Sequence, residues 1–281
     1  MSEIAWINGE FLPLERAMVH VEDRGFQFAD AVYEVVRTYN GKPFALAEHM
    51  ARLFRSLAAI QLNPGLTSEQ LEPVIREAIE RAAFPEALVY LQITRGPAPR
   101  HRGFPAKPKP TVVLTVRALK PALHVRETGV SVITVPDIRW SRCDIKSVGL
   151  LANVLAYQAA KDAGAYDAIF VTNDGVVTEA TAANIFMVSK GALVTPPKCA
   201  SLLPGVTRDK ILHAGAAAGI AGREEKIQKE DLFAAEEVFL TSTTAEVVPV
   251  IAVDGQKIGN GRPGPAAGRV CKKFLELFAQ L

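Results

Sequence analysis

One lysine of this sequence stands where an amine could do covalent chemistry. Lys146 lies in "DIRWSRCDIKSVGLL", residues 137–151, between an apolar strand-like run at 130–135 and an apolar helical stretch that follows it. Apolar surroundings on both sides would desolvate the amine and favour its uncharged, nucleophilic form. An amine in that form can make a Schiff base with a carbonyl compound. The ordinary alternative is a solvated surface lysine.

A second set of candidate groups lies in residues 175–209, "GVVTEATAANIFMVSKGALVTPPKCASLLPGVTRD". Its "PGVTRD" segment enters a predicted helix, so the backbone N–H groups of Val206 and Thr207 could bind a phosphate. Glu179, earlier in the segment, could face a cationic group. Taken alone, it could equally be a helix cap or a surface carboxylate.

The elements that must position these groups belong to a mixed α+β chain. Asn-Gly pairs at 8–9 and 40–41 interrupt strand-like runs and predict hairpins. Residues 31–39 are rich in β-branched and aromatic types, as a strand requires. Apolar residues at helical spacing predict two helices, at 46–62 and at 68–83.

A polar, proline-containing stretch around 118–128 is the best candidate for a domain boundary. It would separate a smaller α+β N-terminal domain, residues 1–120, from a larger C-terminal domain, residues 121–281. The elements expected in the larger domain are helices at 148–163, after Pro204 and at about 266–280, and strands at 130–135, 166–172, 184–189, 192–196, 237–242 and 248–255.

Size, charge and cysteine content limit the class of protein. The chain has 281 residues, 49% of them hydrophobic and 22% charged, with a net charge of +2. This is the profile of a soluble globular protein with no preference for nucleic acid. Its first residues lack the features of a signal peptide, and its apolar runs are far shorter than the roughly 20 residues that cross a membrane.

Metal and dinucleotide sites are not expected. The three cysteines have no metal-like spacing and fit a reducing cytoplasm, and the five histidines are scattered. The segment "GNGRPG", residues 259–264, has the letters of a dinucleotide loop. Too little chain follows it for the helix, strand and acidic residue that such a fold needs.

The segment that holds Glu179 has the ordered, gapped pattern of a known family. Glu179, "ANIF", "LVT" and "LPGVTR", which ends at Arg208, resemble in order and spacing the signature of the class IV pyridoxal-phosphate aminotransferases. The blocks "VEDRGFQFADAVYEVVRTYNG", "EHMARLFRS", "ITRGPAPRHRGFP" and "FLTSTTAEVVPV" are similar to those of bacterial D-amino-acid transaminases. The resemblance implies the type IV fold of pyridoxal-phosphate enzymes, with two domains and the cofactor between them.

The resemblance also implies roles for the candidate residues. Lys146 would carry pyridoxal 5'-phosphate as a Schiff base and then move the proton at the substrate's Cα. Glu179 would face the pyridine nitrogen and keep it protonated. The cofactor phosphate would be bound by Arg52, by the backbone of Val206 and Thr207, and by the loop of Ser242 and Thr243.

Substrate binding departs from the family pattern at one position. In the D-amino-acid enzymes a tyrosine, an arginine and a histidine hold the α-carboxylate. Tyr33 and Arg100 match the first two, whereas Arg102 stands at the third and His101 comes one place earlier. Arg102 could favour dicarboxylates such as glutamate, crowd the pocket, or point to solvent.

The family's substrate loop reaches the neighbouring subunit, so the resemblance implies a functional homodimer. Three further residues could lie near the ring hydroxyl or the substrate, or could pack in the core: Tyr166, Arg139 and Trp140.

The expected reaction exchanges an amino group between a D-amino acid, with D-alanine and D-glutamate as the natural pair, and a 2-oxo acid such as 2-oxoglutarate or pyruvate. Three alternatives stay open. A branched-chain L-amino-acid aminotransferase would use the same Lys146 and Glu179. A lyase of the aminodeoxychorismate type would release pyruvate without an acceptor. A non-catalytic binder of pyridoxal phosphate would need no such set of residues.

Overall fold

The computed structural model describes residues 1–278 of the chain and groups them into two compact units. The N-terminal unit comprises Met1–Lys120 together with Ile145–Gly149. The C-terminal unit comprises Pro121–Asp144 and the described residues from Leu150 to 278. Lys146 therefore belongs to the N-terminal unit, although Pro121–Asp144, which belong to the C-terminal unit, lie between it and Lys120 in the sequence.

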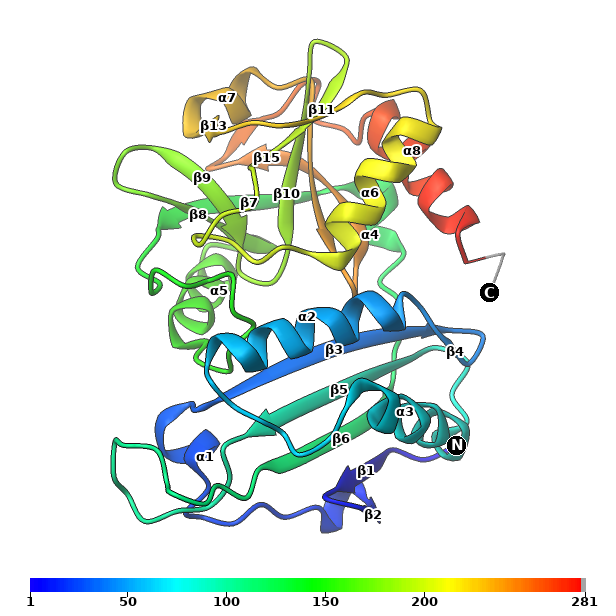
Figure 1. Cartoon of the computed structure of the whole chain (residues 1–281). Helices are drawn as coiled ribbons and strands as arrows, with labels where there is room; N and C mark the ends of the chain where they lie inside the picture. The colour runs from blue at the N-terminus through cyan, green and yellow to red at the C-terminus, as the bar shows by residue number, and fades with distance from the viewer. Residues whose placement is uncertain (279–281) are drawn as a thin grey trace. The chain divides into compact units, whose positions relative to one another are not determined.

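The N-terminal unit is built on an antiparallel sheet with the strand order β2-β1-β6-β5-β3-β4 (Figure 1). Both predicted Asn-Gly hairpins are confirmed, because β1 pairs with β2 across Asn8-Gly9 and β3 pairs with β4 across Asn40-Gly41. The strands are β1 (Ile4–Ile7), β2 (Glu10–Pro13), β3 (Ala31–Tyr39), β4 (Lys42–Pro43), β5 (Ala87–Thr94) and β6 (Thr111–Ala118).

Two long helices pack on this sheet, α2 (Leu46–Ala59) on β3 and α3 (Ser68–Ala82) on β6 and β1. Their apolar residues recur at helical spacing and are buried against the sheet, which explains why the sequence predicts both helices. Two short elements were not predicted, α1 (Arg24–Phe28) and a 3-10 helix at Leu14–Arg16. A helix of one turn leaves too short a pattern to read.

The C-terminal unit contains a larger mixed sheet with the order β12-β11-β10-β14-β15-β7-β8-β9-β13, and β16 pairs with β15. Stacked Phe186 and Phe239 lie in its centre. The strands are β7 (Val130–Pro136), β8 (Asp167–Val171), β9 (Val176–Ala180), β10 (Asn184–Ser189), β11 (Ala192–Thr195), β12 (Gly222–Glu224), β13 (Ile227–Gln228), β14 (Glu237–Ser242), β15 (Glu246–Val253) and β16 (Gln256–Lys257).

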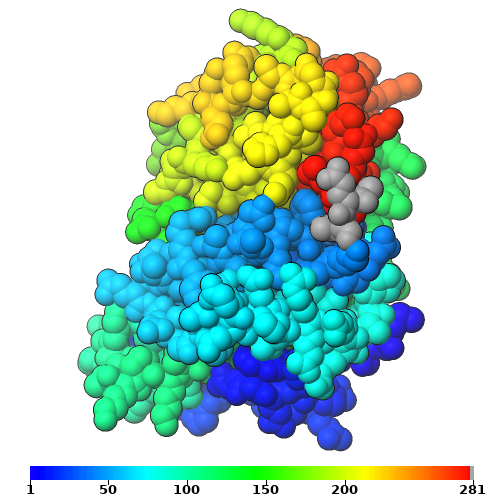
Figure 2. Space-filling view, turned by 45° about the vertical axis from the view of Figure 1, so that its right-hand side comes forward, coloured from blue at the N-terminus to red at the C-terminus, as the bar shows by residue number. Residues whose placement is uncertain are grey.

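Helices cover parts of this sheet. In the C-terminal unit, α5 packs on β8, while α6 and α8 pack on each other and on β14 (Figure 2, yellow and red). The helices are α4 (His124–Thr128), α5 (Leu151–Asp162), α6 (Val206–Ala217), α7 (Lys229–Ala234) and α8 (Pro265–Glu276). No helix within residues 1–278 has the length and apolar character to span a bilayer.

Three predicted helix limits are corrected. The helix expected at 46–62 is α2, which ends at Ala59. The helix expected at 148–163 begins only at Leu151, because the preceding residues bond to the N-terminal unit: the Val148 N–H donates to the Ala31 carbonyl. The helix expected at about 266–280 is α8, which ends at Glu276. The last two predicted positions, 279 and 280, lie outside the described residues.

Candidate active site

Lys146 is held on β3 of the N-terminal unit by its own backbone. Its carbonyl accepts a hydrogen bond from the Tyr33 N–H at 2.9 Å, and its N–H donates to Ser56 Oγ at 3.3 Å. The half-buried side chain lies with Nζ 4.3 Å from the centre of the Tyr33 ring. Two predicted residues, far apart in sequence, are therefore brought together, and the amine is presented over an aromatic face.

Arg52, predicted to bind phosphate, lies one turn before Ser56 on α2. It is buried and donates two hydrogen bonds to Glu34, at 2.9 and 2.6 Å. His49 Nδ1 also contacts Glu34, at 3.0 Å. Burial alone would raise the pKa of Glu34, but the charge of Arg52 and hydrogen bonds from His49 and Arg52 outweigh it and lower that pKa well below its usual range.

The sequence analysis did not select Glu34 or His49. A signal for Glu34 was present, because β3 buries Val32, Glu34 and Val36 on one face, and a carboxylate inside an apolar alternation needs a partner. Burial lowers the pKa of His49, and the charges of Arg52 and Lys146 act in the same direction, while Glu34 opposes them. The neutral form of His49 is thereby favoured.

Replacing Glu34 should destabilise the fold. We expect Glu34→Gln to lower the free energy of unfolding at pH 7 by about 3 kcal/mol, because Arg52 is left buried without its counter-charge. The folded-state pKa of Glu34 is lowered, so its contribution is present above the ordinary carboxyl range and is lost as pH falls through the folded value. The deficit of the variant should therefore shrink in acid.

Urea unfolding followed by circular dichroism would measure this difference. Glu77→Gln is the matched control, since Glu77 makes an exposed ion pair with Arg81 on α3. It should change the free energy of unfolding by no more than about 0.5 kcal/mol. Equal effects of the two substitutions would contradict the role given to Glu34.

Arg100 and Arg102 lie in the loop between β5 and β6, and both are exposed. Arg100 Nη1 donates to the Gln27 carbonyl at 3.3 Å, and its guanidinium lies 4.6 Å from the centre of the Phe28 ring. Within residues 1–278, no hydrogen bond or ring contact joins either arginine to Tyr33. The predicted substrate residues thus form two separate groups in this chain, Tyr33 beside Lys146 and the two arginines beside α1.

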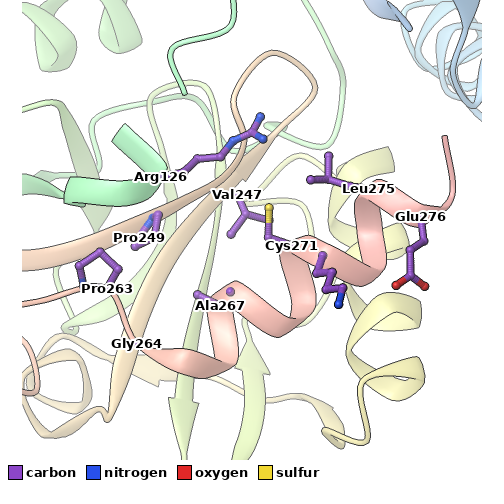
Figure 3. Close-up of a pocket in the computed structure, with 11 residues that line it drawn as sticks. Arg126, Val247, Pro249, Pro263, Gly264, Ala267, Cys271, Leu275 and Glu276 are labelled. Carbon is purple, nitrogen blue, oxygen red and sulfur yellow. The ribbon is translucent and has the colours of Figure 1, made fainter. Parts of the chain in front are cut away.

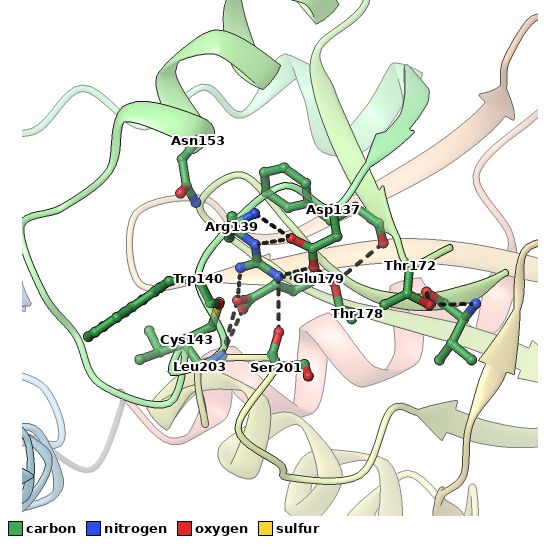
Figure 4. A network of polar contacts seen from close by, with 12 residues as sticks. Asp137, Arg139, Trp140, Cys143, Asn153, Thr172, Thr178, Glu179, Ser201 and Leu203 are labelled. Atoms are coloured by element: carbon green, nitrogen blue, oxygen red, sulfur yellow. Dashed lines mark hydrogen bonds and ion pairs between the residues drawn. The ribbon is translucent and has the colours of Figure 1, made fainter. Parts of the chain in front are cut away.

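Glu179 lies on β9 in the C-terminal unit at the centre of a buried polar network (Figure 4). Arg139 donates to one carboxylate oxygen at 2.5 Å. The Leu203 N–H lies 3.1 Å from both oxygens, and Asn184 Nδ2 lies 3.4 Å from the second. Donors therefore surround the carboxylate, which is the arrangement that holds an anion in place.

Arg139 is the residue of this network that the sequence analysis underrated. Its side chain is 5% exposed, and it also donates to Asp137 at 2.8 and 2.9 Å and to the Ser201 carbonyl. Burial would raise the pKa of Asp137, but hydrogen bonds from Arg139 and the charge of Arg139 hold it below its usual range. The Asp-x-Arg spacing in sequence was the signal for this pair.

Two of the predicted phosphate residues lie at the start of α6. Val206 and Thr207 occupy its first turn, where N–H groups have no acceptor within the helix, and no side chain caps this turn. The N-cap residue Gly205 lies against Asn184, since a Cβ there would approach Asn184 Oδ1 to 2.0 Å. Through Asn184, which also bonds Glu179, the helix start is tied to the Glu179 network.

Thr243 follows β14, whose last residue is Ser242. Thr241, just before it, pairs with Asn184 on β10, so their side chains share a face of the sheet. Thr241 Oγ1 is buried and has no hydrogen-bond partner among the described residues. A buried hydroxyl without a partner, beside an uncapped helix start, is a place where an anionic group fits.

A separate hollow in the C-terminal unit has a volume of about 550 Å³ (Figure 3). It lies beside α8 and is lined chiefly by apolar side chains, with Arg126 at one end. None of the predicted cofactor or substrate residues lines it. It is therefore distinct from the site that the sequence predicts.

Comparison with known proteins shows the family to which the chain belongs. The family described as amino-transferase class IV matches residues 31–253. A D-alanine aminotransferase of Bacillus licheniformis is 41% identical over 263 residues, which are 94% of this chain and 93% of that protein. One from Listeria monocytogenes serotype 4b is 38% identical over 277 residues, 98% and 96% of the two chains.

Solved structures share the fold. A branched-chain amino acid aminotransferase from Escherichia coli superposes with a TM-score of 0.90 at 29% identity, covering 99% of this chain and 95% of that one. Another branched-chain amino acid aminotransferase, from the thermophilic archaeon Thermoproteus uzoniensis and solved with norvaline, gives a TM-score of 0.90 at 26% identity, covering 99% and 95%. The predicted mixed α+β, type IV fold is confirmed.

Proposed function

The chain belongs to the class IV aminotransferases, and we propose that it moves an amino group between a D-amino acid, of the D-alanine and D-glutamate type, and a 2-oxo acid. The observation that carries this proposal is the placement of Lys146 over Tyr33 in a chain 41% identical to a D-alanine aminotransferase. The solved branched-chain enzymes share the fold at lower identity. A shared fold does not by itself imply a shared substrate.

We propose pyridoxal 5'-phosphate as the cofactor, because the residues present fit it. Lys146 would hold it covalently, and Glu179 would face its ring nitrogen. Its phosphate would be bound by Arg52, the N–H groups of Val206 and Thr207, and the hydroxyls of Ser242 and Thr243. Lys146 and Arg52 belong to the N-terminal unit, and the other proposed cofactor residues belong to the C-terminal unit.

When bound, the cofactor supplies an electron sink for the bonds at the substrate's Cα. The chain's own residues do the rest. The amine of Lys146 would accept the proton from the substrate's Cα and deliver it to C4′ of the cofactor. Glu179, oriented by Leu203 and Arg139, would hold a proton on the ring nitrogen. Tyr33, together with Arg100 and Arg102 of the second copy in the dimer proposed below, would bind the α-carboxylate.

The proposal is tested with purified protein and pyruvate or 2-oxoglutarate as acceptor. We expect turnover of D-alanine and D-glutamate and none of L-leucine or L-valine. Turnover of the L-amino acids alone would make the protein a branched-chain aminotransferase. Pyruvate release without any acceptor would indicate a lyase. Absence of the cofactor's visible absorbance would indicate that the protein does not carry pyridoxal phosphate.

We propose that the active form is a homodimer. Helix α5 buries only Ala156 and Ala160 in its own chain, whereas Leu151, Val154 and Leu155 are more than half exposed. Ile138 and Trp140, in the loop that leads to Lys146, are also exposed. A helix that is apolar on both sides is normally covered on both sides, and a second copy of this chain would supply the cover.

The dimer should depend on α5. We expect Leu155→Glu to weaken self-association at least about tenfold, because one buried leucine contributes about 1.5–3 kcal/mol. Sedimentation equilibrium measures the change. Leu123→Glu is the matched control, since Leu123 has the same 56% exposure as Leu155 but lies before α4. A monomeric unmodified protein would contradict the proposal.

We propose a cytoplasmic location, because the cysteines fit a reducing compartment. Cys143, Cys199 and Cys271 are all free in the structure. Unpaired cysteines are usual in cytosolic proteins and unusual in secreted ones.

A further inference from the structure

A buried arginine on α1 holds the main chain of the substrate loop. Arg24 is 3% exposed, and its Nη1 donates to the carbonyls of His101 at 2.5 Å and Gly103 at 3.2 Å. Its Nη2 approaches the Arg102 carbonyl at 3.4 Å. One guanidinium thus contacts three consecutive carbonyls of an exposed turn, which a planar fork of five donors can do and a point charge cannot.

The guanidinium is itself fixed from behind. Arg24 Nε donates to Asp30 at 2.8 Å, and Arg95 donates to both oxygens of Asp30 at 2.8 and 2.9 Å. Arg95 also donates to the carbonyls of Ile60 and Gln61, so the carboxylate sits in a rigid frame. Burial would raise the pKa of Asp30, but hydrogen bonds from the two arginines, and their charges, lower it.

The base of the loop is closed independently of Arg24's side chain. The Arg24 N–H donates to the Gly96 carbonyl at 3.1 Å. Gly96 has φ +84°, and a Cβ there would lie 1.7 Å from the Lys109 carbonyl oxygen, so the two ends of the loop touch through a residue without a side chain. Asp23 accepts hydrogen bonds from Thr94 and Thr111, which joins α1 to both flanking strands.

The hydrogen bonds from Arg24 to the carbonyls of residues 101–103 determine which side chains of this turn are available to a ligand. His101 Nδ1 accepts the Gly103 N–H at 3.1 Å, so its ring braces the turn. Arg100 stacks on Phe28, which Arg24 also faces at 5.0 Å. Within residues 1–278 the Arg102 side chain makes no hydrogen bond or ion pair. Arg102 is therefore the side chain that the turn leaves for a ligand, at the position where the D-amino-acid enzymes carry histidine.

We propose that Arg24 is a positioning residue for substrate specificity: by holding the carbonyls of residues 101–103, it presents Arg102 to the α-carboxylate of the substrate. This inference rests on the proposed function, since it assigns Arg102 to carboxylate binding. Arg24 itself would not touch the substrate.

The test compares Arg24→Gln and Arg24→Lys with the unmodified holoenzyme. Loss of the fork should raise KM for D-alanine about tenfold or more in Arg24→Gln and leave kcat within about threefold, because the reacting groups are untouched. Arg24→Lys should give a smaller rise, since one ammonium reaches fewer carbonyls. Amide hydrogen exchange of residues 101–104 should become faster in both variants, in the same order.

Arg81→Gln is the control, because among the described residues Arg81 makes only an exposed pair with Glu77 and a contact with Phe11. It should change neither KM nor exchange in the loop. Unchanged amide exchange of the loop or an unchanged KM in Arg24→Gln would overturn the proposal. A fall in kcat as large as the rise in KM would also overturn it, because it would indicate a general structural defect. If the unmodified enzyme accepts only L-amino acids, the proposed function fails, and KM for the accepted amino acid decides the role of Arg24.

Discussion

Lys146→Ala should abolish multiple turnover while the fold survives. Its Cβ and backbone remain, so the hydrogen bonds that join Lys146 to Tyr33 and Ser56 are kept. The loss would be chemical, because Lys146 is the residue proposed to take the Cα proton. We expect kcat with D-alanine and 2-oxoglutarate to fall by at least about 10³-fold, within the range that one positioned acid–base group contributes. Steady-state kinetics and the circular dichroism spectrum measure the two halves of this prediction.

Lys146→Arg separates charge from nucleophilicity. An arginine keeps a cation near the Tyr33 ring, but its guanidinium stays protonated and cannot form an imine. It should therefore be as inactive as the alanine variant. Lys226→Ala, at an exposed position between β12 and β13, should keep full activity. An active Lys146→Arg enzyme would show that charge alone is required and would remove Lys146 from the covalent role.

The N-terminal unit was largely predictable because its elements carry local signals. The Asn-Gly turns and the apolar spacing of α2 and α3 act within a few residues of sequence. The start of α5 was misjudged for a non-local reason. Val148 would continue the apolar pattern of the helix, but its N–H donates to the Ala31 carbonyl on β3.

The candidate site divides in the same way. Lys146, Glu179 and Tyr33 were found because their residue types and the surrounding motif suggest chemistry. Arg139 and Asn184 support Glu179 across gaps of 40 and 5 positions, and no local pattern reveals that pairing. Arg24 is a stronger case, because its partners are carbonyls, which are present in every residue and leave no trace in sequence.

Glu179→Gln should slow the reaction without removing the cofactor. The amide has nearly the shape of the carboxylate, its oxygen can still accept from the Leu203 N–H, and Arg139 keeps Asp137 as a counter-ion. A neutral amide cannot hold a proton on the ring nitrogen as an anion does, so electrons flow less readily from Cα into the ring. We expect kcat to fall about 10²-fold, similar to the loss of one preorganised electrostatic group.

Single-turnover absorbance after addition of D-alanine measures this step directly, and equilibrium titration with pyridoxal phosphate measures cofactor binding. Glu179→Asp is the matched control. It keeps the charge but shortens the reach by one methylene, so it should lose less activity than the isosteric amide. If the two variants are reversed in rate, shape rather than charge matters at this position, and the carboxylate would serve to orient Leu203 and the start of α6. If kcat is unchanged in Glu179→Gln, the ring nitrogen needs no anion from this residue.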